Sequence, residues 1–176
     1  RRISEPPPPG AGVYMEVHRR TPSPAPPPPA AGSVRVEMRE EIEHLIGRVL
    51  ARGGFDEGAA RLLAEMGDDA LAEMVKRFPG PLDCDRYQES SRLKCVGQHG
   101  PLLRALLVFG ARAAPYVAPL LDSFDSEVRF YATFFFSEVL APDALPGLVK
   151  RLFDGDRQIR VLALDVIRGF ESLPEY

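Results

Sequence analysis

The chain has few of the residues that build metal or disulfide sites. Cys84 and Cys95 are the only cysteines in 176 residues, and they have neither the Cys-x-x-Cys spacing nor the paired histidines that hold zinc. We expect two ordinary thiols in a reduced, cytoplasmic protein, with a disulfide between them as the alternative. His18, His44 and His99 lie in three separate segments without metal-ligand spacing. The sequence therefore predicts no metal site.

Catalytic patterns are also missing. The serines at 90–91 lack the setting of a nucleophile elbow, and no glycine-rich phosphate loop or dinucleotide fingerprint occurs. The acidic pairs Asp68-Asp69 and Glu40-Glu41 fall at expected helix starts, where negative charge complements the helix dipole. The sequence therefore predicts no catalytic residue and no cofactor, and we expect the protein not to be an enzyme.

Long apolar runs and an excess of positive charge are absent as well. No apolar run approaches the roughly 20 residues that a helix needs to cross a bilayer. The formal net charge of −3 gives no general attraction to phosphate backbones or anionic lipids. Residues 35–176 are more acidic, with 18 Lys and Arg against 23 Asp and Glu, whereas residues 1–34 are slightly basic. We therefore expect neither a membrane nor a nucleic acid as partner.

Proline is concentrated near the start of the chain. Ten of the 18 prolines lie in residues 1–34, as EPPPPGAG and TPSPAPPPPAAG. Because proline fixes φ and lacks an amide donor, this arm is predicted to be an extended, polyproline II linker or tail. The intervening VYMEVHRR, at 13–20, alternates apolar and polar residues like a strand. It could instead be a short peptide that docks on a partner or on its own domain.

Apolar residues recur at helical spacing from Ser33 onward. Ser33 is expected to cap a first helix that ends at Gly53-Gly54, and two further helices are predicted over 56–66 and 70–78. Residues 79–99 interrupt this pattern with prolines, glycine and polar residues. They are predicted to form a long loop with one short helix near 87–96.

Part of the sequence is repeated at a fixed interval. The segment DSEVRFYA, which begins at Asp125, resembles DRQIRVLA, which begins at Asp156, and a proline upstream of each segment is matched at the same interval. Internal repetition with a period of roughly 30 residues is typical of stacked supersecondary units, each too small to bury its apolar face alone. The matched pairs are Asp125 and Asp156, Val128 and Ile159, Arg129 and Arg160, Ala132 and Ala163, and Pro115 and Pro146.

This unit resembles the HEAT repeat, an α-helical hairpin family, in its bacterial form that is similar to the phycobilin lyases. The two clearest units are 114–139 and 143–167, with weaker similarity over 100–110 and 62–78. The resemblance implies an all-α fold. It further implies a right-handed α-solenoid of about three to four hairpins over 35–176. The resemblance is absent in 1–34, the predicted extended tail, and in 79–99, the predicted loop insertion.

The repeated residues have simple physical roles. Either Pro115 or Pro119, together with Pro146, is expected inside a first helix, which it would bend. The repeated Asp is expected to cap the second helix of each unit by accepting orphan amide hydrogens. The repeated Arg is expected to pair with that carboxylate or with the turn of the adjacent unit. We interpret these residues as structural.

The helix around 126–139 carries aromatic residues on more than one face. At 100° per residue, one face holds Val128, Ala132, Phe135, Phe136 and Val139, with Tyr131 at its margin. Phe130 and Phe134, with Ser137, fall on the opposite side of the helix. The interval of the repeat matches the two phenylalanines with Val161 and Asp165 of the next unit. In the HEAT resemblance, second helices line the concave surface. The predicted protein-binding residues are Phe130, Phe134, Ser137, Val161 and Asp165.

Three functions are compatible with the sequence. The first is a non-enzymatic scaffold that binds a protein partner on the solenoid surface. This partner could be another protein, the Pro-rich arm or another domain of the parent protein. The alternative is that the arm, the 79–99 loop or a neighbouring helix simply covers the two phenylalanines. The second, implied by the resemblance alone, is a HEAT-like enzyme such as a bilin lyase or a DNA glycosylase. The third is recognition through the Pro-rich arm, with the solenoid as a spacer.

Overall fold

The computed structural model describes residues 31–51, 53–88 and 94–171. No strand occurs within these ranges, which confirms the all-α class. The Pro-rich arm, including the strand-like 13–20, lies outside the described residues. The helices and short 3-10 helices follow in this order: α1 (Ala31–Leu50), α2 (Glu57–Met66), α3 (Asp68–Val75), η2 (Val96–Gln98), α4 (Pro101–Phe109), η3 (Gly110–Ala113), α5 (Ala114–Val117), η4 (Ala118–Asp122), α6 (Ser126–Glu138), η5 (Pro142–Ala144), α7 (Leu145–Arg151) and α8 (Arg157–Glu171).

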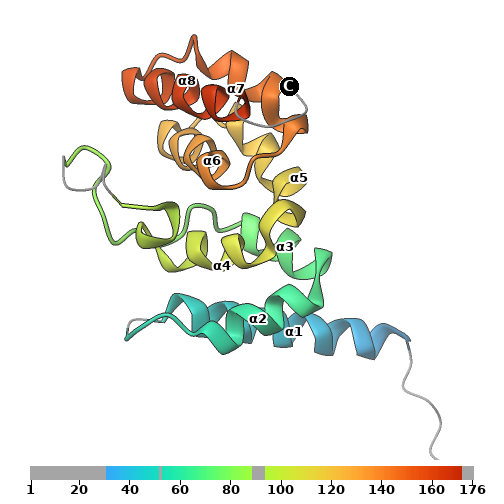
Figure 1. The fold of residues 1–176 in the computed structure, drawn as a ribbon. Helices are drawn as coiled ribbons and strands as arrows, with labels where there is room; N and C mark the ends of the chain where they lie inside the picture. Colours follow the sequence, from blue (N-terminus) through green and yellow to red (C-terminus); the bar gives the residue numbers. More distant parts are fainter. Residues whose placement is uncertain (1–30, 52, 89–93, 172–176) are drawn as a thin grey trace, which may run out of the picture.

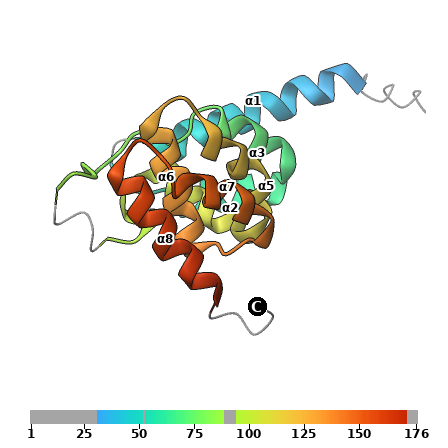
Figure 2. The same cartoon turned by 90° about the horizontal axis from the view of Figure 1, so that it is seen from above.

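The helices lie in successive layers, from α1 and α2 at one end to α7 and α8 at the other (Figure 1). Along one row α1 packs against α3, α3 against α5, and η4 against α7. Along the other row α2 packs against α4, α6 meets η2 just before α4, and α6 packs against α8. Viewed from above, α6 and α8 lie side by side (Figure 2). The second row therefore ends in the pair α6 and α8.

The first helices are positioned by their end residues. The Asp56 side chain caps α2 by accepting the Ala59 amide at 2.9 Å, and Gly67 ends it with φ +71°. The predicted second helix is confirmed. The predicted cap at Ser33 was wrong, because α1 already begins at Ala31, and the third helix begins at Asp68, two residues before its predicted start.

The prolines lie within helical runs, as predicted, but the geometry of these runs changes along the chain. η3, α5 and η4 follow one another without a gap and alternate between 3-10 and α geometry. Pro115, Pro119 and Pro146 each occupy the first or second position of α5, η4 and α7. The residues that precede these positions, Ala113, Val117 and Ala144, are themselves helical, so each proline lies in a continuous helical run and leaves one carbonyl of the preceding turn without an amide donor. The prolines therefore mark the places where the helical geometry changes.

The core face of α6 is wider than the helical wheel suggested. Phe135, Phe136 and Ala132 are fully buried, as predicted. Tyr131, expected at the margin, is also fully buried, whereas Val128 is only half-buried. The buried face of α6 is therefore shifted from Val128 toward Tyr131. Cys84 and His99 cover that side of the helix, as their contacts with the Tyr131 hydroxyl show.

The described parts of the 79–99 segment, 79–88 and 94–99, lie against the helices. The Asp83 amide donates to the His99 carbonyl at 2.8 Å, and the Val96 amide donates to the Glu138 carboxylate at the end of α6. The predicted helix over 87–96 was wrong in its described part, since Tyr87 lies in a turn and the helical turn is η2. At Gly100 a Cβ would lie 2.4 Å from the Pro81 carbonyl oxygen, so only glycine allows the two ends of the segment to approach.

Candidate functional site

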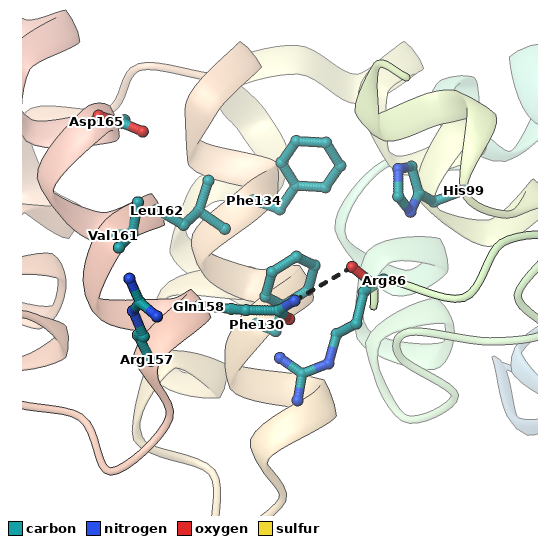
Figure 3. A pocket seen from close by; sticks show the side chains of 9 residues that line it. All are labelled: Arg86, His99, Phe130, Phe134, Arg157, Gln158, Val161, Leu162 and Asp165. Atoms are coloured by element: carbon teal, nitrogen blue, oxygen red, sulfur yellow. Dashed lines mark hydrogen bonds between the residues drawn. The ribbon is translucent and has the colours of Figure 1, made fainter. Parts of the chain in front are cut away.

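A pocket opens between α6 and α8 on one side and the 79–99 segment on the other. Its volume is about 590 Å³. Figure 3 shows side chains from the two helices facing Arg86 and His99 across it. Because the two helices belong to the repeated segments, equivalent positions of the repeat line the same pocket. The lining residues are Arg86, His99, Phe130, Phe134, Arg157, Gln158, Val161, Leu162 and Asp165.

Four of the five predicted binding residues meet in this pocket. Phe130 and Phe134 come from α6, and their equivalents in the repeat, Val161 and Asp165, come from α8. Both phenylalanines are half-buried, and their ring centroids lie 6.0 Å apart. Ser137 does not line the pocket; its exposed hydroxyl donates to the Phe134 carbonyl at 2.6 Å. Ser137, near the C-terminal end of α6, therefore lies outside the pocket that the other four residues line.

Arg86 closes one wall of the pocket, although the sequence analysis assigned it no role. It is buried, with 4% of its surface exposed. Its Nη2 donates to the Asp156 carboxylate and to the Tyr87 hydroxyl, both at 2.7 Å. Its guanidinium lies 4.7 Å from the centre of the Phe130 ring and 4.6 Å from that of Tyr87, within cation–π range. The 79–99 segment is thereby joined to α6 and to the N-terminal end of α8.

Some polar atoms of this wall have no partner among the described residues. Arg86 Nε, Arg86 Nη1 and Gln158 Oε1 are buried without a hydrogen bond. Gln158 Nε2 does donate to the Arg86 carbonyl, at 3.4 Å. A buried polar group left without a partner costs about 1–3 kcal/mol. The favourable contact of the guanidinium with two aromatic faces offsets part of that cost.

His99 lines the pocket and packs against the fully buried Tyr131, which does not line it. The His99 ring makes edge-to-face contacts with Phe134 at 5.0 Å and with Tyr131 at 5.7 Å, measured between ring centres. The Tyr131 hydroxyl lies 3.4 Å from His99 Nδ1 and 3.5 Å from the Cys84 carbonyl oxygen. Burial raises the pKa of Tyr131 to about 12, so it remains a neutral phenol. Phe134 thus packs against His99, which in turn packs against Tyr131.

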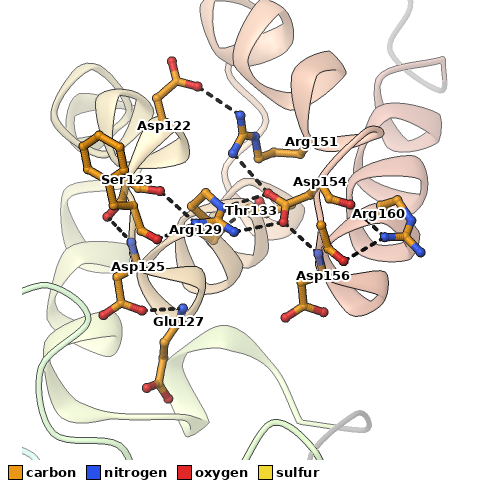
Figure 4. Close-up of polar contacts among 12 residues, drawn as sticks. Asp122, Ser123, Asp125, Glu127, Arg129, Thr133, Arg151, Asp154, Asp156 and Arg160 are labelled. Atoms are coloured by element: carbon orange, nitrogen blue, oxygen red, sulfur yellow. Dashed lines mark hydrogen bonds and ion pairs between the residues drawn. The ribbon is translucent and has the colours of Figure 1, made fainter.

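The turns that precede α6 and α8 are built from the same contacts at equivalent positions (Figure 4). Asp125 Oδ1 accepts the Glu127 amide at 2.8 Å, and Asp156 Oδ1 accepts the Gln158 amide at 2.8 Å, as the capping prediction required. The Arg129 guanidinium donates to the carbonyls of residues 123 and 124, six and five positions earlier. Arg160 does the same to the carbonyls of residues 154 and 155. The repeat is therefore a repeat of turn geometry.

Arg129 pairs with the turn of the adjacent unit, which was one of the two partners expected for the repeated Arg. It does not pair with Asp125 of its own unit but binds the Asp154 carboxylate in the turn of the next unit. Asp154 also accepts from Arg151 Nη1 at 3.1 Å and from the Asp156 amide at 3.0 Å. Hydrogen bonds from Arg129 are the main reason that the pKa of Asp154 lies below its ordinary value, against the effect of burial. This network fixes α6 relative to α8.

Other reactive groups do not converge. Among the residues that the structure describes, no three His, Cys, Asp or Glu side chains lie close enough to hold a metal ion. Cys84 and Cys95 are free thiols, and Cys84 Sγ lies 3.0 Å from Lys94 Nζ. The pocket offers aromatic faces, aliphatic side chains and a few charges. Such a surface suits recognition of an apolar side chain with charged neighbours.

One segment is apolar enough to cross a membrane by length and composition. Pro101–Asp122 spans 22 residues and contains a window of mean hydropathy 1.2, so the expectation that no run approaches this length was wrong by that measure. A core helix of a soluble protein passes the same test, and 39% of the window is buried. The segment is weak support for a span. The cytoplasmic location and the absence of a membrane partner stay predictions.

A comparison with protein-family models finds no match to this chain. Comparisons with curated proteins and with solved structures find no match either.

Proposed function

We propose that this chain is a protein-binding module, with the pocket between α6 and α8 as the site that holds its partner. The observation that carries the proposal is the half-exposed pair Phe130 and Phe134, set against Val161 in a pocket of about 590 Å³. Binding sites usually combine such apolar floors with a few placed polar groups. Fully burying an exposed phenylalanine or valine contributes roughly 1.5–3 kcal/mol, which gives a partner a reason to dock there.

The proposal includes the finer architecture. We infer a short right-handed solenoid of the HEAT kind, in which each hairpin leans on its neighbours. The recurrence of the same capping and arginine contacts in the two turns supports this inference. In such a solenoid, α6 and α8 are successive second helices. Equivalent positions of neighbouring units then form one continuous surface, to which Phe134 and Asp165 both belong.

Binding of a peptide to the pocket tests this function. A random peptide library displayed on phage is selected on the full chain, and the affinity of the enriched peptides is then measured by fluorescence polarisation. The double variant Phe130→Ala, Phe134→Ala is expected to weaken binding by about 5- to 30-fold, which is the usual effect of truncating an anchor residue. Circular dichroism and thermal melting establish that the variant is folded.

The matched control removes two phenylalanines elsewhere. Phe124 and Phe153 lie in turns and are almost fully exposed, at 105% and 85% of the reference surface. The variant Phe124→Ala, Phe153→Ala is expected to bind the selected peptides with unchanged affinity. If this control variant loses binding while the pocket variant keeps it, the binding surface lies on the turns and the proposed site is wrong.

A further inference from the structure

Three side chains of α8 line the pocket in a row, with a basic residue first, an apolar residue in the middle and an acidic residue last. Arg157, Val161 and Asp165 are four residues apart, so they share one helical face, and all three line the pocket. Figure 3 shows Arg157 and Asp165 at opposite ends with Val161 between them. At 1.5 Å of rise per residue, the two charged positions are about 12 Å apart along the helix. The pocket therefore has a basic end, an apolar centre and an acidic end.

Neither end charge is cancelled by a strong local partner. At the basic end, Asp156 already binds Arg86 at 2.7 Å, while the neighbouring Arg157 is exposed. At the acidic end, Asp165 contacts Arg168 at 4.0 Å, and both side chains are about two-thirds exposed. Exposed pairs of this kind contribute little and exchange readily with other partners. Both charges are thus free to select a ligand of opposite charge.

The net charge of residues 35–176 limits which charges a partner segment can carry. Residues 35–176 carry 18 basic and 23 acidic side chains, so a segment that is acidic throughout would be repelled at long range. A segment with one carboxylate and one cation avoids that repulsion. It can still satisfy both ends of the pocket.

We propose that the pocket recognises an extended protein segment with a carboxylate, an apolar side chain and a cation at alternate positions. This inference rests on the proposed function and specifies the partner's chemistry. In an extended chain every second side chain faces the same way, and four residues span about 13 Å. That length matches the distance of about 12 Å between the charged positions of α8. The carboxylate lies beside Arg157, the apolar side chain enters between Phe134 and Val161, and the cation lies beside Asp165.

A displayed peptide library with a fixed central phenylalanine tests this arrangement. The flanking positions are random, and selection is run on the full wild-type chain and on the single variants Arg157→Glu and Asp165→Lys. Both variants change exposed side chains, and thermal melting checks that they are folded. On the wild type we expect an acidic residue two positions to one side of the phenylalanine and a basic residue two positions to the other. The enrichment expected for each matched charge is about two- to fivefold.

The variants should change the selected charges in opposite directions. Arg157→Glu is expected to select a basic residue on both sides, and Asp165→Lys an acidic residue on both sides. If the enriched sequences are lost on Phe134→Ala but show no change of charge between the variants, the charge inference fails and the proposed function stands. If no sequence is enriched on the wild type, both fail. Enrichment of sequences that resemble residues 13–17 would instead identify the chain's own arm as the occupant and overturn the inference.

Discussion

The Arg129 guanidinium forms two parallel hydrogen bonds with the Asp154 carboxylate, 2.8 Å from Nε and 3.0 Å from Nη2. The two residues are 25 positions apart, one in α6 and the other in the turn that precedes α8. A bidentate pair of this geometry fixes both direction and distance, which a single-point contact does not. The relative position of α6 and α8, and hence the shape of the pocket between them, depends on this pair.

Loss of the Asp154 carboxylate should destabilise the fold strongly. Its side chain is 2% exposed and that of Arg129 is 16% exposed, so Asp154→Ala leaves a largely buried cation without its carboxylate. We expect a decrease of about 3–5 kcal/mol in the free energy of unfolding, measured by urea denaturation. Asp122→Ala is the control, because Asp122 is 53% exposed where it pairs with Lys150 and Arg151. Asp122→Ala should lower the free energy of unfolding by less than about 1 kcal/mol. An equal decrease in the free energy of unfolding for the two variants would contradict this role for Asp154.

The same carboxylate should make stability depend on acid pH. Hydrogen bonds from Arg129 hold the pKa of Asp154 below 3.8, its ordinary value. A depressed pKa in the folded state means that the stabilisation is present above the unfolded value and is lost as the pH falls through the folded one. The stability difference between wild type and Asp154→Asn should therefore be constant from about pH 7 to pH 5 and narrow below about pH 4. A difference that widens on acidification would show the opposite sign and refute the assignment.

Tyr131 should make stability depend on alkaline pH. Burial raises its pKa from 10.0 to about 12. Because the unfolded chain loses this proton first, the contribution is present below about pH 10 and is lost as the pH rises toward 12. Ultraviolet absorption at high pH should therefore show a tyrosine that ionises near pH 12, and Tyr131→Phe should remove both that step and the accompanying loss of stability. If the step near pH 12 is unchanged in Tyr131→Phe, it belongs to another tyrosine such as Tyr116, whose pKa burial also raises.

The close approach at Gly100 should tolerate no side chain. A Cβ there would lie 2.4 Å from the Pro81 carbonyl oxygen, and this neighbour is backbone that cannot rotate away. We expect Gly100→Ala to lower the free energy of unfolding by about 1–3 kcal/mol, as overpacking does. Gly155→Ala is the matched control, because nothing lies within 4 Å of the Cβ it would add. Comparable melting temperatures for the two variants would mean that the 79–99 segment does not depend on this contact.

Local patterns predicted much of the fold. The capping roles of Asp125 and Asp156 were found because a cap acts on amides two or three residues away. The constant interval of the repeat identified equivalent turns, and helical periodicity identified the face of α6 that carries Phe130 and Phe134. These signals are short-range or periodic, so a single sequence can reveal them.

The other half of the pocket had no such signal. Arg86 meets Asp156 across 70 positions, and it belongs to a segment without periodicity. Nothing in the sequence separated this arginine from the other basic residues until the fold brought it between Tyr87 and Phe130. The spacing of His99 argued against a metal ligand, but it did not predict that the His99 ring packs edge-on against Phe134. Contacts of this kind depend on the path of the 79–99 segment.

The proline prediction located the prolines but not the geometry around them. Pro115 and Pro119 lie inside a continuous helical run, but that run changes between 3-10 and α geometry at η3, α5 and η4. No local pattern in the sequence indicated these changes.

Nuclear magnetic resonance of the full chain with a library-selected peptide is the most direct test of the pocket as the binding surface. On titration, backbone amide shifts are expected to change mainly at Phe130 and Phe134 in α6 and over 157–165 in α8, which flank the pocket. Shift changes concentrated instead at the turns of Phe124 and Phe153, with α6 and α8 unaffected, would contradict the proposed function.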